Sequence, residues 1–291
     1  MRRLCLLVAA ACATPVSSEP RANQAPAQTR DDPYAEHIAA LRARLEGKGL
    51  RGLQYGIEAP FVVVGNGTAK DLERDAQTVK WAIEHLEADF FDRRPAKILD
   101  VFLFRDARSY ERGVRILTGD EPGTPYGFYS RTHRGLFMNI ATGGGTLVHE
   151  IVHPYVEADF PGAPAWLNEG LGSLFEQSAS RDGHIVGMTN WRLAGLQRAI
   201  ADERVPGFHA LTHMDGATFY GDDSGVNYAA SRYLLYYLQE QGVLRDFYKA
   251  FRANRQQDPS GYTTLVAVLG GEDMAAFEKR WRTYVRGLTF P

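Results

Sequence analysis

Two histidines one helical turn apart, with a glutamate between them, are the residues of this sequence best suited to chemistry. They are His149, Glu150 and His153, which form the run His-Glu-Ile-Val-His inside a segment with helical apolar spacing. On a helix of 3.6 residues per turn the two histidines share one face, about 6 Å apart, so both imidazoles can reach one Zn2+. Glu150 is turned about 100° from His149, beside the metal rather than on it. A general base for a metal-bound water belongs at that position.

A carboxylate in the next predicted helix can complete the site. Glu169 stands beyond His153, after the fifteen residues 154–168, in a helix that we expect to begin at Pro164. A Pro-Gly turn at 161–162 would fold this helix back toward the two histidines. Two His, one Glu and one position left for water are the ligand set of a catalytic zinc centre, whereas a structural centre is closed and often uses Cys. We therefore expect one Zn2+ held by His149, His153 and Glu169.

Around these residues the chain resembles the gluzincin metallopeptidases, and most of all their bacterial peptidase MA-like group. The likeness spans about residues 126–288 and is strongest in the runs Gly145–His153 and Ala163–Leu171. Tyr228–Leu238 and Phe277–Trp281 are similar to later helices of the group. The resemblance implies a zincin-like fold, one Zn2+, and hydrolysis of peptide bonds through a metal-activated water.

The resemblance also assigns roles to single residues. It implies that His149, His153 and Glu169 are the zinc ligands and that Glu150 is the general base. Such enzymes often carry a Tyr or His that stabilises the tetrahedral oxyanion. Tyr228 matches that residue by position, and Tyr220, His209 and His213 could take its place.

One position departs from the pattern of thermolysin-type relatives. There an Asp four residues after the ligand Glu orients a zinc-bound His, but this chain has Ser173 at that position. Since histidine ligands depend on such a partner for their orientation, we expect Glu176 or a backbone carbonyl to replace it.

The elements that must position the site fall into two halves. The first half predicts a helix that starts at a capping box formed by Thr68 and Asp71 and runs to Phe90, and a second helix over Asp106–Leu117. Its apolar runs predict strands, the last two of them joined as a hairpin at a sheet edge: Phe61–Val64, Ile98–Phe104, Tyr126–Ser130 and Gly135–Ile140. Gly135–Ile140 resembles the edge strand along which zincins align an extended substrate, although an ordinary core strand fits the same pattern.

Beyond the glycines at 143–145 the pattern turns almost entirely helical, and Pro154 should kink or end the first helix early. The helical segments are Thr146–Val156, Pro164–Gln177, Trp191–Asp202, Asn227–Gln241, Val243–Arg255 and Glu272–Leu288. Strands followed by helices indicate an α+β class. We expect a small mixed sheet with helices in the N-terminal half, then the active-site helix, then a mostly helical C-terminal half.

The N-terminus predicts export from a bacterial cell. Arg2 and Arg3 precede a short apolar run, which is typical of a signal peptide over residues 1–13 and too short for a membrane span. The only cysteines are Cys5 and Cys12; an A-x-A site would remove Cys12, whereas an imperfect lipobox would make it a lipid anchor. Residues 14–33 indicate a flexible linker and residues 34–291 one metallopeptidase domain, strand-rich over 55–142 and helical over 143–291. The protein would then be periplasmic, envelope-attached or extracellular.

The overall charge argues against nucleic acid as a partner. Lys and Arg number 33 against 35 Asp and Glu, a net charge of -2, so no basic field exists to attract nucleic acid. We expect a peptide or protein substrate, no nucleic acid and no transmembrane span. Two other functions fit the motif: a catalytically idle binding protein on the same fold, and a zinc hydrolase of a non-peptide amide.

Overall fold

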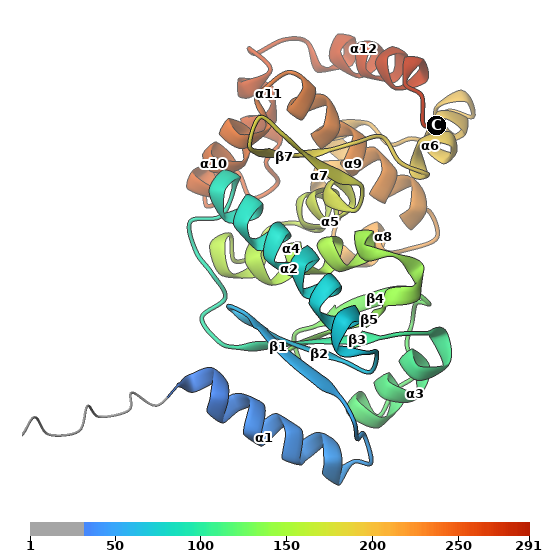
Figure 1. Cartoon of the computed structure of the whole chain (residues 1–291). Coiled ribbons are helices and arrows are strands. Elements are labelled where there is room, and N and C mark those ends of the chain that lie inside the picture. Colours follow the sequence, from blue (N-terminus) through green and yellow to red (C-terminus); the bar gives the residue numbers. More distant parts are fainter. Residues whose placement is uncertain (1–31) are drawn as a thin grey trace, which may run out of the picture. The chain divides into compact units, whose positions relative to one another are not determined.

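A five-stranded mixed sheet organises the N-terminal half of the computed structural model, which describes residues 32–291 (Figure 1). Its strands, in spatial order, are β1 (Gln54–Glu58), β2 (Phe61–Gly65), β3 (Leu99–Phe104), β5 (Gly135–Asn139) and β4 (Gly127–Ser130). Strands β2, β3 and β5 are parallel to one another, and β1 and β4 run antiparallel to them at the two edges. The predicted signal peptide over 1–13, Cys12 and most of the predicted linker lie outside the described residues.

Side chains of the central strands point alternately to the two faces of the sheet and pack into two separate cores. Val62 and Val64 of β2 pack on one face with α1 (Pro33–Gly47) and α3 (Ala107–Thr118). Phe61 and Val63 pack on the opposite face with α2 (Ala69–Asp89) and α4 (Gly144–Asp159). Because both faces are covered, β2 and β3 are apolar almost throughout and entirely buried. The prediction of helices over this sheet is confirmed.

Side-chain caps fix where two of these helices begin. Thr68 and Asp71 form the predicted capping box at the start of α2, and Asp106 caps α3 through Ser109. Helix α1 and strand β1 were not predicted. Only Leu41 and Leu45 of α1 are buried, so its apolar stripe is too short to give a clear helical signal.

The C-terminal half is helical apart from one hairpin, formed by β6 (Ser178–Arg181) and β7 (His184–Gly187). Helix α5 lies against α4 and α9, and α12 covers α6 and α9. The bounds are α5 (Ala165–Phe175), α6 (Arg192–Ala201), α7 (Phe208–His213), α8 (Gly216–Phe219), α9 (Ser224–Glu240), α10 (Leu244–Asn254), α11 (Tyr262–Val268) and α12 (Met274–Gly287). The predicted α+β class is confirmed; the hairpin and the short helices α7, α8 and α11 were missed.

Helix α4 does not end at Pro154. It continues to Asp159, although Pro154 has no N–H to donate to the carbonyl of Glu150. The residues that follow, Tyr155 and Val156, are fully buried in the core. Their packing stabilises the last turn against the loss of one hydrogen bond.

The sheet edge nearest the helical half is β4, not β5. Strand β5 lies between β3 and β4 and pairs with both, so of the two interpretations of Gly135–Ile140 the edge strand is wrong and the core strand is confirmed. The two runs are joined as a hairpin, as predicted, but β5 carries the fully buried side chains and takes the inner place. Among the described residues, no helix has the length and apolarity needed to cross a bilayer.

Candidate metal centre and its pocket

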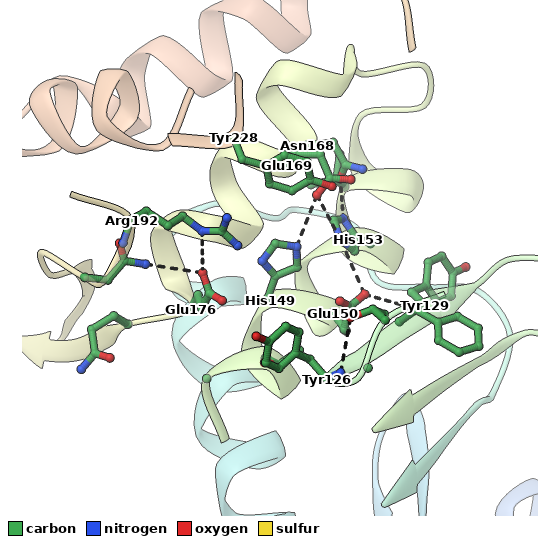
Figure 2. Close-up of a pocket in the computed structure, with 18 of the residues that line it drawn as sticks. Tyr126, Tyr129, His149, Glu150, His153, Asn168, Glu169, Glu176, Arg192 and Tyr228 are labelled. Carbon is green, nitrogen blue, oxygen red and sulfur yellow. Dashed lines mark hydrogen bonds and ion pairs between the residues drawn. The ribbon is translucent and has the colours of Figure 1, made fainter. Parts of the chain in front are cut away.

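Helix α4 brings His149, Glu150 and His153 together, as their spacing in the sequence predicts. His149, Glu150 and His153 each offer a ligand atom, and these atoms lie within 4.8 Å of one another. The two imidazole centroids are 5.0 Å apart, and His149 and Glu150 are buried. Figure 2 shows the three side chains close together among the residues that line a pocket, between Arg192 and Tyr129.

Helix α5 adds Glu169 to this group. Its Oε2 lies 3.3 Å from Nε2 of His149 and 3.8 Å from Nε2 of His153. The chain turns back after α4 at Gly162, whose φ of 82° is in the left-handed region, and α5 begins three residues later. The structure therefore brings together the three donors expected from the sequence.

Two glycines let α5 lie this close to α4. A Cβ at Gly172 would come within 3.0 Å of the His149 ring, and a Cβ at Gly145 would come within 2.3 Å of the carbonyl oxygen of Glu176. Both contacts join residues far apart in sequence, so sequence reasoning did not find them. The absence of a Cβ at Gly172 leaves room for the edge of the imidazole that carries Nε2.

A polar neighbour fixes the orientation of His153. Its Nδ1 lies 3.1 Å from Oδ1 of Asn168, the residue before Glu169, so Nε2 is the atom directed at the site. Asn168 was not among the partners expected from the sequence.

Among the hydrogen bonds of the described residues, neither partner expected for a zinc-bound His, Glu176 or a backbone carbonyl, bonds His149 or His153. Glu176 is bonded instead to Arg192 and Asn190. The carbonyl of Ser173 accepts a hydrogen bond from Arg232. The position of the missing Asp is thus used to join α5 to α9, and the hydrogen-bond partner of His149 is Glu169.

Glu150 has a partner from the sheet edge. Its Oε2 accepts a hydrogen bond of 2.8 Å from the backbone N–H of Tyr129 in β4 and lies 3.7 Å from Nε2 of His153. Burial raises the pKa of Glu150, although His149 and His153 act in the opposite direction. The N–H of Tyr129 thus anchors the Glu150 carboxylate beside the three donors His149, His153 and Glu169.

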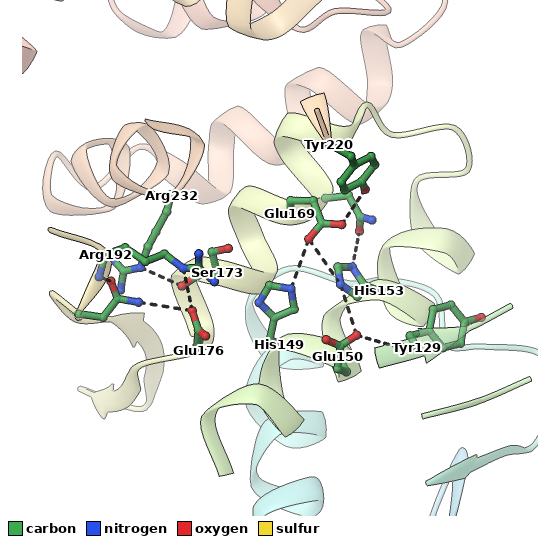
Figure 3. A network of polar contacts seen from close by, with 12 residues as sticks. Tyr129, His149, Glu150, His153, Glu169, Ser173, Glu176, Arg192, Tyr220 and Arg232 are labelled. Atoms are coloured by element: carbon green, nitrogen blue, oxygen red, sulfur yellow. Dashed lines mark hydrogen bonds and ion pairs between the residues drawn. The ribbon is translucent and has the colours of Figure 1, made fainter. Parts of the chain in front are cut away.

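Two tyrosines flank Glu169. Tyr220 donates a hydrogen bond of 2.7 Å to Oε1 of Glu169, and Tyr228, on α9, is half-buried and lines the pocket (Figures 2 and 3). Burial, together with the charge of Glu169, raises the pKa of the Tyr228 hydroxyl. The two histidines considered for the oxyanion role, His209 and His213, stack on each other at α7 and are not among the residues that line the pocket.

The charges at the centre are complementary. Burial acts to raise the pKa of Glu169, but His153, His149 and Tyr220 outweigh it and lower that pKa to about 2. Burial likewise acts to lower the pKa of His149, and the hydrogen bond with Glu169 reverses the direction. Glu169 is therefore an anionic donor across the neutral pH range.

The donor set fits zinc. A tetrahedral zinc ion with bonds of about 2.0–2.2 Å keeps its ligand atoms roughly 3.3–3.5 Å apart. The separations of 3.3 Å and 3.8 Å between Glu169 and the two histidines come close to that value. Two neutral imidazoles and one carboxylate are ligands that zinc takes, and the adjoining cavity of about 1270 Å³ leaves room on the open side.

Comparison with known proteins adds no family to these observations. No protein-family model matches the chain. No curated protein matches it either.

Proposed function

We propose that this protein is a zinc-dependent peptidase of the gluzincin type, with a zincin-like fold. The observation that carries the proposal is the convergence of His149, His153 and Glu169, with Glu150 anchored beside them. His149, His153 and Glu169 would hold one Zn2+. When bound, zinc supplies a Lewis acid that polarises the scissile carbonyl and activates water.

The chain's own residues account for the proton transfers. Glu150 accepts the proton of the attacking water and passes it to the leaving nitrogen, and the N–H of Tyr129 keeps one carboxylate oxygen in place meanwhile. Tyr228 reaches the same pocket and donates to the oxyanion that develops on the substrate. Its neutral hydroxyl, with a raised pKa, suits a donor.

The outer edge of β4, which lines the pocket, offers a track for an extended substrate. In the antiparallel pair of β4 and β5, alternate residues turn their backbone groups away from β5; Tyr129 does so, since its N–H reaches Glu150. Gly127 shares that direction and lines the pocket. A peptide could therefore add a strand at this edge and place its scissile bond beside Glu150.

Digestion of a broad peptide library by the purified protein, with and without bound zinc, tests the proposal. Zinc-dependent cleavage of peptide bonds supports it. A protein that binds no zinc would instead be an idle binding protein. Zinc binding without peptide cleavage, but with hydrolysis of small amides, would make it an amidase.

We propose further that residues 1–13 direct export, to the periplasm, the envelope or the medium. Mass spectrometry of the mature protein tests this. A new N-terminus after residue 13 supports a free protein, and a lipid on Cys12 supports an anchored one. An intact Met1 in the mature protein contradicts export by this signal.

A further inference from the structure

A guanidinium group with an open side lines the same pocket as the metal centre. It belongs to Arg192, at the start of α6. Within the described residues, the one hydrogen bond of this guanidinium runs from Nε to Oε2 of Glu176, at 3.1 Å. The two Nη groups have no hydrogen-bond partner there, although the side chain is only 16 % exposed. Both Nη groups stay accessible, and a ligand that enters the pocket can therefore pair with them.

The surroundings hold this guanidinium in one orientation. It stacks over the ring of Trp191 at 4.2 Å and lies 5.4 Å from the ring of Tyr228. Asn190 supports the arrangement, since its side chain contacts Glu176 and the backbone N–H of Arg192. A fork that is fixed before binding loses little entropy when a ligand arrives.

A second, buried arginine leaves this wall of the pocket positively charged. Arg232 is fully buried; it donates to the carbonyls of Ser173 and Met188, and its Nη1 has no partner among the described residues (Figure 3). Burial lowers its pKa to about 10, so it stays cationic at neutral pH. Glu176 is the carboxylate that acts on both arginines. Two positive charges thus face one negative charge.

The wall lies next to the metal centre. Tyr228 contacts Arg192 on one side, and its hydroxyl interacts with Glu169 on the other. An extended peptide advances about 3.3 Å per residue. A group that reaches Arg192 therefore belongs to a residue close to the scissile bond.

Resting on the proposed peptidase function, we infer that Arg192 binds a carboxylate of the substrate through its two Nη groups. A bidentate guanidinium–carboxylate pair satisfies the open donors and the excess positive charge together. The carboxylate is either an acidic side chain or the C-terminus of the peptide. The enzyme would accordingly select substrates with an acidic group at one fixed distance from the cleaved bond.

Peptide binding to a zinc-loaded variant that cleaves slowly tests this inference separately from the proposed function. Calorimetry with Glu150→Gln would use N-acetylated hexa-alanine amides that carry one Glu at each position in turn. Matched peptides would carry Gln, and one hexa-alanine would have a free C-terminus. We expect one Glu position, or the free C-terminus, to bind at least tenfold more tightly than its neutral partner, about 1.4 kcal/mol at 25 °C.

Second-site variants identify the residue responsible. Adding Arg192→Gln should abolish the preference, and Arg192→Lys should retain part of it, since the charge remains but the fork is lost. Arg198→Gln removes the same charge from an exposed position of the same helix and should leave the preference intact. A preference that survives Arg192→Gln, as when a carboxylate merely ligates zinc, contradicts the inference. So does the absence of any preference.

The same peptides, given to the wild-type protein, report cleavage independently. A carboxylate preference in binding without cleavage would keep the role of Arg192 and reject the peptidase. Cleavage without a carboxylate preference would keep the peptidase function and reject the role of Arg192.

Discussion

The backbone N–H of Tyr129 donates a hydrogen bond of 2.8 Å to Oε2 of Glu150. It joins the outermost strand of the sheet to the one acidic residue of the α4 motif. This contact therefore links the strand that could align a substrate directly to the base that would act on it. Any shift of β4 changes the place of Glu150.

Replacing Tyr129 by proline tests this contact, because proline removes the N–H and is tolerated at a strand edge. We expect peptide cleavage to fall tenfold or more while zinc remains bound. Tyr129→Phe keeps the N–H and removes only the hydroxyl that donates to Glu157. It should therefore stay close to wild type. Equal losses in both variants would assign the effect to the side chain.

Gly172→Ala should weaken zinc binding, because the new Cβ would come within 3.0 Å of the His149 ring. The ring must move, and its Nε2 with it. Competition with a chromogenic chelator measures the affinity, which we expect to fall about tenfold or more, as for other losses of ligand support. Gly195→Ala is the matched control, since nothing lies within 4 Å of its Cβ in α6. An unchanged zinc affinity in Gly172→Ala would show that the contact does not hold the ring.

Asp258 should make the fold sensitive to acid. Burial acts to raise its pKa, but hydrogen bonds from Thr264 and Ser260 outweigh it and lower the pKa below the ordinary value. A carboxylate with a lowered folded-state pKa stabilises the protein above the unfolded-state pKa of about 3.9, and this stabilisation is lost as the pH falls through the folded-state pKa.

Asp258→Ala should accordingly reduce the free energy of unfolding by about 2 kcal/mol at pH 7. Denaturant melts at several pH values measure it, and the gap to wild type should narrow below about pH 4. Asp222→Ala, at an exposed position, should cost little at any pH. A gap for Asp258→Ala that stays constant down to pH 3 would contradict the pKa assignment.

Patterns within short stretches of sequence predicted their structures well. The apolar runs became β2 and β3, and Thr68 with Asp71 formed the predicted cap. The spacing of His149, Glu150 and His153 fixes their faces on any helix, and the turn at Gly162 brings Glu169 to them. These features depend on residues close together in the chain.

Features that join distant residues were not predictable. The sequence could not show which run of the hairpin lies outermost, so Gly135–Ile140 was left as either an edge strand or a core strand. It could not show that Gly172 meets His149, or that Glu176 turns to Arg192. The first depends on which strand pairs with β3, and the others on how α4, α5 and α6 pack together. No local pattern encodes either.

Glu150→Gln tests the central claim most directly, with zinc content and peptide cleavage measured on the same sample. The amide keeps the size of the side chain but cannot take a proton from water. We predict one zinc per chain, as in wild type, and a rate of cleavage lower by roughly a thousandfold. Glu84→Gln, an exposed control on α2, should change neither quantity. Wild-type cleavage by zinc-loaded Glu150→Gln would contradict the role of Glu150 as the base.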